Sequence, residues 1–231
     1  MTVLGREILA RPTLEAASVL LGARLVRDPE GSGARNRRVG RIVELEAYIG
    51  EEDAASHARF GRTIRNQVMW ARPGTAYVYL VYGMYDCLNV VTEPIGRPAA
   101  LLIRAVEPID GADAMRAARL EAVRARRRLD RAAIGAERDR LDRLAATHLA
   151  RGPGLVAAAF GIDRTSTGLD LLDPGSTLRL EPPAPGDRAP DPRWTPRIGI
   201  AYAGSPWTER SWRLLDASSA SVSGPRPAPR G

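Results

Sequence analysis

The sequence contains no lysine, and that absence restricts the covalent chemistry open to the protein. All 34 basic residues among its 231 residues are arginines, so no lysine amine can form a Schiff base. His57 in DAASH has no partner at metal-ligand spacing, and Cys87 is the only cysteine. A GxSxG elbow for a serine nucleophile is also missing. These absences predict a protein without a metal or another cofactor.

Long apolar runs are missing too. No stretch of the sequence reaches the length of a membrane span, and the first residues lack the apolar core of a signal peptide. A single cysteine excludes an intramolecular disulfide and is typical of a reducing compartment. We therefore expect a soluble, cytoplasmic monomer with no membrane partner.

Nothing in the sequence resembles a linker between two cores. A chain of 231 residues is long enough to bury one substantial core. We expect one domain over residues 1–217, followed by a C-terminal segment, 218–231, whose proline-rich end is disordered.

Aromatic residues make up only 5% of the chain, yet five of its six tyrosines fall between residues 41 and 108. Such crowding favours a surface that stacks on flat ligands. The positive charge lies elsewhere: from Arg116 to Arg151, eleven arginines stand against five acidic residues, within a chain of net charge +7. A basic protein favours a polyanionic partner. Most of these arginines also fit a solvated helix face with ion pairs such as Asp139–Arg143, so both interpretations stay open.

Hydrophobic periodicity and turn residues predict a mixture of helices and strands. Helices are expected over residues 13–21, with Thr13 as N-cap, across 112–150, and from the GPG turn at 152–154 to about 160. Strands are expected at 23–26, 39–48, 77–82, 85–92, 99–106 and 197–202, with a hairpin turn at Gly83-Met84. The proline-rich stretch 173–195 is expected to be a surface connection.

Two carboxylates and one arginine carry the candidate chemistry. Alternation divides the 39–48 strand into a face with Val43, Leu45 and Ala47 and a face with Ile42, Glu44, Glu46 and Tyr48. A carboxylate beside aromatic rings suits a general base, because partial desolvation tunes its proton affinity. The alternative interpretation is a solvent-exposed sheet face that carries two solvated carboxylates. Arg104 interrupts the apolar strand ALLIRAVEP, and an unpaired buried guanidinium is costly. We expect Arg104 to pair with Glu44 or Glu46.

The expected hairpin also carries a ring and a thiol that require an explanation. Tyr82 stands at its turn, where a large ring could act as a wedge between bases or could pack on the protein's own loop. Cys87 lies inside a strand, which favours a buried structural thiol over a nucleophile.

Together these blocks resemble the alkyladenine (3-methyladenine) DNA glycosylase family, the type without helix-hairpin-helix architecture. The resemblance runs through LLGARLVR, GRIVELEAYIG, DAASHARFGRTIRN, PGTAYVYLVYGMYDCLNVVTEP, LLIRAVEP, GPG and PRIGI. It implies an α+β fold in one domain, with a curved, mostly antiparallel sheet, surrounding helices and a protruding β-hairpin. Glu52, Leu45, Trp70 and Asp86 depart from the family pattern, as do the arginine-rich stretch and the C-terminal tail.

The resemblance also implies roles for individual residues. Glu46 would activate water, which Arg104 and the backbone carbonyl of Val222 would hold. The pocket for the flipped purine would be formed by Tyr48, His57 and Tyr79, with Asn89 at its floor to screen the 2-position. Tyr82 would fill the gap left in the duplex. The remaining DNA-facing residues would be Arg62, Thr63, Arg65, Asn66 and Met69.

The function implied is a monofunctional DNA glycosylase of base excision repair. It would bind double-stranded DNA, flip out a damaged purine and direct water to C1′, leaving an abasic site without strand cleavage. Two alternatives stay open: a DNA-binding relative without catalysis, and an N-glycoside hydrolase for free nucleosides. Whether the lesions are alkylated purines alone, or also hypoxanthine and etheno-adenine, is not decided by the sequence.

Overall fold

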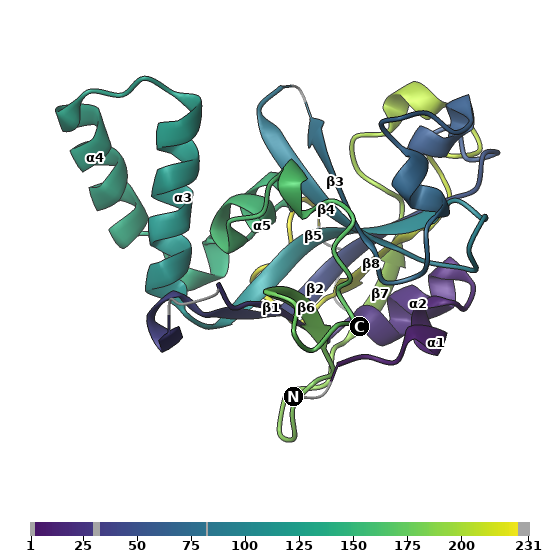
Figure 1. The fold of residues 1–231 in the computed structure, drawn as a ribbon, viewed down its shortest axis with the longest axis horizontal. Helices are drawn as coiled ribbons and strands as arrows, with labels where there is room; N and C mark the ends of the chain where they lie inside the picture. Colours follow the sequence, from purple (N-terminus) through teal and green to yellow (C-terminus); the bar gives the residue numbers. More distant parts are fainter. Residues whose placement is uncertain (1–2, 30–32, 82, 226–231) are drawn as a thin grey trace.

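The architecture is a single antiparallel sheet with helices on its faces and at one end (Figure 1). The structure is a computed structural model that describes residues 3–29, 33–81 and 83–225. Within those residues, eight strands pair in the order β3-β4-β5-β2-β1-β6, and β8 adds to both β2 and β7. Their bounds are β1 Arg24–Arg27, β2 Arg38–Ile49, β3 Ala76–Val81, β4 Tyr85–Val91, β5 Ala99–Asp110, β6 Leu178–Glu181, β7 Pro192–Thr195 and β8 Arg213–Asp216. The predicted α+β class, curved sheet and hairpin are confirmed.

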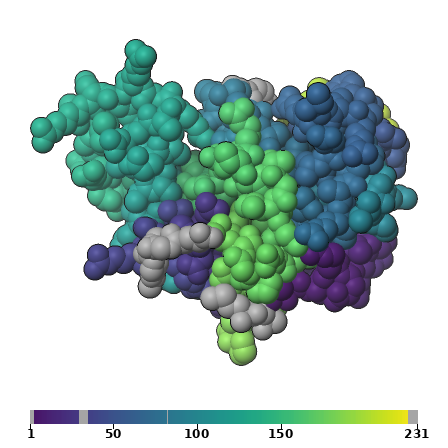
Figure 2. Space-filling model, viewed as in Figure 1, coloured from purple at the N-terminus to yellow at the C-terminus, as the bar shows by residue number. Residues whose placement is uncertain are grey.

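Five α-helices lie in the described part of the chain: α1 Arg6–Leu9, α2 Thr13–Leu20, α3 Ala112–Arg126, α4 Arg131–Asp142 and α5 Pro153–Phe160. Helix α5, with the apolar sequence PGLVAAAF, is buried between the sheet strands β4 and β5 and helix α3. Helix α4 contacts α3, and the two form an arm at one end of the molecule (Figures 1 and 2). We call residues 112–142 the α3–α4 arm.

A β-bulge in the centre of the sheet changes the predicted faces of β2. Its pairing with β5 shifts between Ile42 and Glu44, so Val43 is the extra residue there. As a result Ile42 joins Leu45 and Ala47 in the main core, while Val43 packs in a separate small cluster with Val222. The strict alternation predicted for this strand was therefore wrong at residues 42 and 43, whereas Glu44 and Glu46 do share one environment.

The predicted strand at residues 197–202 was also wrong. Its polar groups serve other partners: the Arg197 guanidinium donates to the Ala47 carbonyl and the Asp53 carboxylate, and the Ile198 N–H donates to Glu46. The segment instead runs as a loop into a short 3₁₀ helix, Ala201–Ala203. The Arg197–Asp53 pair is fully buried and fastens this loop to residues 50–56. Two adjacent loops, 50–75 and 196–212, are thereby joined beside β2.

Two further sequence expectations need correction. Thr13 is not an N-cap: helix α2 begins at Thr13 itself, whose hydroxyl and N–H both donate to the Glu93 carboxylate. The Glu93 carboxylate, distant in sequence, thus accepts hydrogen bonds at the start of the helix, and its negative charge interacts favourably with the positive end of the helix dipole. The stretch 173–195 is more than a surface connection, because it contains β6, which pairs with β1, and β7, which pairs with β8.

Candidate active site

Two carboxylates and two arginines form a buried cluster where β2, β5 and β8 meet. Arg104 Nε lies 2.9 Å from Glu44 Oε1, and its Nη1 lies 3.2 Å from Glu46 Oε2. Arg213 Nε lies 2.7 Å from the same Glu44 oxygen. Both carboxylates have no exposed surface. The predicted pairing of Arg104 with this carboxylate face is confirmed.

Arg104 remains a cation in this cluster. Burial alone would lower the pKa of the Arg104 guanidinium, but the charges of Glu46 and Glu44 outweigh burial and raise that pKa. The paired charges therefore stabilise one another, as a buried ion pair requires.

Glu46 is held from three directions. Besides Arg104, the Ile198 N–H donates to its Oε1 at 2.7 Å and the Tyr48 hydroxyl donates to its Oε2 at 2.9 Å. Burial first, and then the Glu46 charge, raise the pKa of the Tyr48 phenol well above its usual value. Tyr48 therefore keeps its proton and acts as a donor. Three donors fix the carboxylate while leaving lone-pair capacity for a further donor such as water.

Tyr48 connects Glu46 to an aromatic cavity. The lining residues are Tyr48, Ala55, His57, Met69, Tyr77, Tyr79, Asn89, Ala100 and Tyr202. The His57 and Tyr79 rings meet edge to face with centroids 4.4 Å apart, and Tyr77 lies 5.5 Å from Tyr79. The cavity has a volume of about 40 Å³. The structure thus brings the predicted pocket residues Tyr48, His57, Tyr79 and Asn89 together.

His57 is neutral at physiological pH. Burial first, and then the charges of Arg65 and Arg59, lower its pKa to about 4. Its Nδ1 lies 2.9 Å from the Tyr77 hydroxyl, whose pKa burial raises to about 12. The predicted structural thiol Cys87 is buried, with a pKa raised to about 12 by that burial.

Asn89 is fixed in the cavity wall by the hairpin backbone. Its Nδ2 donates to the Tyr77 carbonyl at 3.1 Å and to the Cys87 carbonyl at 3.2 Å. The side chain is buried, with 2% of its surface exposed. Both amide hydrogens are therefore engaged, and the orientation of the amide is set by strands β3 and β4.

Val222 lies next to the cluster but its carbonyl already has a partner. Arg151 Nε donates to the Val222 oxygen at 2.8 Å. The neighbouring Ser223 N–H donates to Glu44 Oε2 at 2.6 Å, and its hydroxyl lies 3.5 Å from Arg104 Nη2. Residues 222 and 223 are thereby joined to the cluster, with one lone pair of the Val222 carbonyl occupied by Arg151.

The predicted DNA-facing residues fall into two groups. Arg62, Thr63 and Arg65 are exposed on the loop that follows His57. Asn66 and Met69 are buried: Asn66 Nδ2 donates to the His57 and Gly61 carbonyls, and Met69 lines the aromatic cavity. Tyr82 lies outside the described residues.

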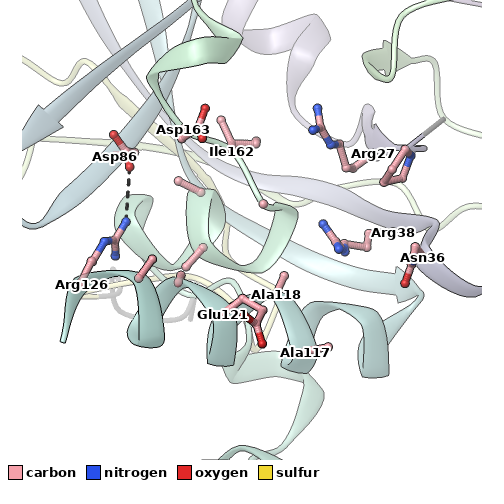
Figure 3. A pocket seen from close by; sticks show the side chains of 16 residues that line it. Arg27, Asn36, Arg38, Asp86, Ala117, Ala118, Glu121, Arg126, Ile162 and Asp163 are labelled. Carbon is pink, nitrogen blue, oxygen red and sulfur yellow. Dashed lines mark hydrogen bonds and ion pairs between the residues drawn. The ribbon is translucent and has the colours of Figure 1, made fainter. Parts of the chain in front are cut away.

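A hollow larger than the aromatic cavity lies elsewhere on the described surface. A cavity of about 630 Å³ lies between α3, α5 and the ends of β1 and β2, where Arg27 and Arg38 point into it (Figure 3). Its walls are mainly alanines of α3 and α5, and no aromatic ring lines it. It has neither aromatic side chains for stacking nor a contact to Glu46, so the aromatic cavity is the candidate active site.

Comparison with known proteins agrees with this geometry. A family model described as Methylpurine-DNA glycosylase matches residues 7–220. A relative from Methanocella arvoryzae, provisionally named a 3-methyladenine DNA glycosylase, is 43% identical over 224 residues that cover 96% of each chain. A relative of the same name from Myxococcus xanthus is 40% identical over 231 residues, covering 100% of this chain and 98% of its own. The chain belongs to the methylpurine-DNA glycosylase family.

A methylpurine-DNA glycosylase is a hydrolase of N-glycosidic bonds in DNA, and it serves DNA repair by base excision. Two findings about the described residues complete the description. No group of three or more His, Cys, Asp or Glu side chains there is arranged to hold a metal ion. None of the helices in that part of the chain is long and apolar enough to cross a membrane.

Several residues of this glycosylase site were missed by the sequence analysis. Arg213 anchors Glu44, and Arg197 lies over the Tyr48 ring, 4.9 Å from its centroid. Tyr202 lines the cavity with 63% of its surface exposed. Arg213 carried a usable signal, because it stands before the apolar pair of SWRLLD as Arg104 stands in LLIRAV. Arg197 and Tyr202 carried none once residues 197–202 were taken as a strand.

Proposed function

We propose that this glycosylase flips a damaged purine out of double-stranded DNA and releases it by direct hydrolysis, leaving an abasic site. The observation that supports this most strongly is the position of Glu46. Its carboxylate is fixed by Arg104, the Ile198 N–H and the Tyr48 hydroxyl, and Tyr48 itself lines the aromatic cavity. Tyr48 thus belongs both to the hydrogen-bond shell of the proposed general base, Glu46, and to the wall of the stacking pocket. An enzyme that acts on a flipped purine needs these two features side by side.

In the proposed reaction, Glu46 accepts a proton from water as the water oxygen forms a bond to C1′. The C1′–N bond breaks, and its electron pair leaves with the purine. Positive charge develops on the sugar in the transition state, and the Glu46 carboxylate stabilises that charge. Arg104 keeps Glu46 oriented and, with the free lone pair of the Val222 carbonyl, holds the water.

The purine would stack among Tyr48, His57 and Tyr79. Electron-poor alkylated rings interact well with electron-rich tyrosine faces. Neutral His57 suits this role, because an imidazolium would oppose a cationic base. Asn89 would form the floor and exclude the 2-amino group of normal guanine.

The cavity must widen for this purpose. Its volume of about 40 Å³ is a few times the roughly 10–15 Å³ that one water molecule needs in a protein cavity. Tyr202, at the open side of the cavity, donates its hydroxyl to the Ala55 carbonyl at 3.1 Å. We propose that movement of Tyr202 and the loop around Ala55 admits the base.

On the DNA side, Tyr82 would occupy the gap left by the flipped nucleotide. Met84 and Tyr85, described residues of the same hairpin, are 50% and 41% exposed. Arg62, Thr63 and Arg65 would contact the backbone, while Asn66 and Met69 would support that loop from inside. The protein would act as a monomer.

We expect direct hydrolysis without a lyase step, because the sequence contains no lysine that could form a Schiff base with the sugar. Borohydride traps a Schiff base between an enzyme amine and the sugar. We expect no trapped protein–DNA product during base release. A trapped product that disappears when the α-amino group is blocked would overturn direct hydrolysis.

The decisive experiment measures base release from duplexes that each carry one lesion: 3-methyladenine, hypoxanthine or etheno-adenine. Wild-type protein should release at least one of them, and Glu46→Gln should lower the rate by about 10²- to 10⁴-fold, the usual contribution of a general base. Glu51→Gln, the same change at an exposed glutamate of the neighbouring loop, is the control. Release by Glu46→Gln at the wild-type rate would contradict the proposed role.

The same assay tests the two alternative functions. A DNA-binding relative without catalysis would bind the lesion duplex and release no base. A nucleoside hydrolase would act on free nucleosides as fast as on the duplex.

A further inference from the structure

A basic groove separates the α3–α4 arm from the tip of the β3–β4 hairpin. The groove has a volume of about 510 Å³ and is lined by Gly83, Met84 and Tyr85 on one side. Arg126, Arg127 and Arg140 of the arm face them, and Gly154 and Leu155 at the start of α5 form the floor. The hairpin tip and the turn between α3 and α4 project from the same side of the molecule (Figure 1).

The arginines of this groove differ in how far neighbouring carboxylates neutralise them. Arg126 lies 3.3 Å from Asp86 and over the Tyr85 ring, and Arg140 forms a bidentate pair with Glu137 (Figure 3 shows the Arg126 pair). Their positive charge is partly balanced inside the protein.

The turn that follows α3 carries the unbalanced charge. Arg127, Arg128 and Arg131 are exposed, and within residues 3–29, 33–81 and 83–225 none of them has a carboxylate oxygen within 4.0 Å. Asp130, the nearest acid in sequence, is occupied: its Oδ1 accepts the Ala133 N–H as the N-cap of α4. Three exposed guanidinium groups without an ion pair among the described residues therefore stand at the tip of the arm, and the charge of Arg127 also acts on Glu137 across the groove.

We propose that the α3–α4 arm binds the sugar–phosphate backbone of the duplex beside the flipped nucleotide. This inference rests on the proposed function, which places the hairpin tip in the DNA. A duplex engaged by the hairpin would present its phosphates to the groove and to the exposed arginines beside it. Guanidinium groups bind phosphate oxygens in a bidentate manner.

The composition of the arm indicates backbone contact rather than base contact. Residues 112–142 contain no aromatic side chain that could stack on a base. Small residues line the groove between the arginines, including Ala122 and Ala158, so a backbone could approach closely. Contacts of this kind add affinity and register without sequence preference.

The test compares two double variants. Arg127→Gln/Arg128→Gln removes two exposed arginines of the turn after α3, of which Arg127 lines the groove. Arg138→Gln/Arg143→Gln removes two exposed arginines, one in α4 and one directly after it, that do not line the groove; Arg138 lines a separate hollow with Asp142. Both variants lower the net charge by the same amount, so an effect of overall charge would be equal in the two.

Binding is measured on a duplex carrying a lesion, at several salt concentrations. Loss of two phosphate contacts should reduce the slope of log K against log salt by about 1.8, at about 0.9 for each contact. At 0.1 M salt the Arg127/Arg128 variant should bind roughly 60-fold more weakly, since each of the two lost contacts is worth close to a factor of ten there. Its half-saturating concentration in base release should rise in parallel, and the Arg138/Arg143 variant should resemble wild type.

Equal losses in the two variants, or no loss in either, would overturn the inference. Equal losses would show that only the net charge matters. No loss in either variant would show that these arginines belong to a solvated helix face without a role in DNA binding. The proposed function is read separately, from base release by the wild-type protein. A wild-type protein that releases no base would contradict that function while the binding comparison still decides the role of the arm.

Discussion

Glu44 holds Arg104 in the position from which Arg104 reaches Glu46: Glu44 Oε1 lies 2.9 Å from Arg104 Nε. The same oxygen accepts Arg213 Nε, and the other oxygen accepts the Ser223 N–H. Glu44 is therefore held by donors from three segments of the chain. Its partners are all cluster residues, whereas Glu46 is the carboxylate that Tyr48 connects to the aromatic cavity.

Glu44→Gln should therefore cost stability. The change leaves two buried guanidinium groups short of one negative charge and directs an amide at the Ser223 N–H. Breaking a buried ion pair costs about 3–5 kcal/mol, so urea unfolding should show a loss of that order. Base release should fall as the folded fraction falls. A variant with wild-type stability and a hundredfold slower release would make Glu44 a second catalytic group.

His57 should make stability depend on pH. Its pKa is about 4 in the folded protein against a usual 6.5, because burial, Arg65 and Arg59 disfavour the proton. Below pH 6.5 the unfolded chain binds more protons at this residue, so its stabilising contribution is complete above pH 6.5 and declines as pH falls toward 4. Between pH 7 and pH 5 the free energy of unfolding should drop more for wild type than for His57→Gln. Parallel curves for the two proteins would contradict this.

Two helical glycines should respond oppositely to alanine. Gly135 in α4 has open space where the methyl group of an alanine would stand, so Gly135→Ala should stabilise the protein by about 0.5–1 kcal/mol through helix propensity. At Gly154 in α5 the new methyl carbon would lie 2.8–2.9 Å from atoms of Tyr85. Gly154→Ala should therefore lose the stabilisation by helix propensity and should displace the hairpin. Melting curves measure the stability, and duplex binding reports the position of the hairpin. In a Tyr85→Gly background, which removes the Cβ at 2.9 Å together with the ring, Gly154→Ala should become stabilising. A stabilising Gly154→Ala in the wild-type background would show that the hairpin yields freely.

The pairing at the centre of the site could be predicted from the sequence, because the cost of burying an unpaired charge restricts which residues can lie there. An arginine inside an apolar strand must find a carboxylate, and Arg104 finds both Glu44 and Glu46. The rule applies equally to Arg213, whose position before the apolar pair of SWRLLD carries the same signal in a shorter strand. The aromatic block likewise marked the cavity, since Tyr48, His57 and Tyr79 come from one stretch of sequence.

The features that were missed depend on partners distant in sequence. The bulge at Val43 arises from the pairing of β2 with β5, which local alternation does not encode. Residues 197–202 read RIGIAY and match a strand pattern, yet Arg197 pairs with Asp53, 144 residues away. The assignment of residues 1–217 as the domain stays a prediction, as do the catalytic and DNA-binding roles of individual residues.

Asn89 offers a test of how the enzyme would reject normal guanine. The side chain lines the cavity and also donates to the Tyr77 and Cys87 carbonyls. Its volume should therefore affect guanine release, and its hydrogen bonds should affect stability. Asn89→Ala removes both, and should gain release of guanine from mismatches while losing some stability. Asn89→Asp keeps the volume but loses the donors, so it should lose stability without gaining guanine release.

Guanine release and a melting curve, measured on both Asn89 variants, separate the two effects. If exclusion is steric, guanine release follows side-chain volume and appears only in Asn89→Ala, with release of a lesion such as hypoxanthine retained. If Asn89 serves the hairpin backbone alone, both variants lose lesion release together with stability. A stably folded Asn89→Ala that releases no guanine would exclude the steric role, because the only side chain assigned to block the 2-amino group would then be gone.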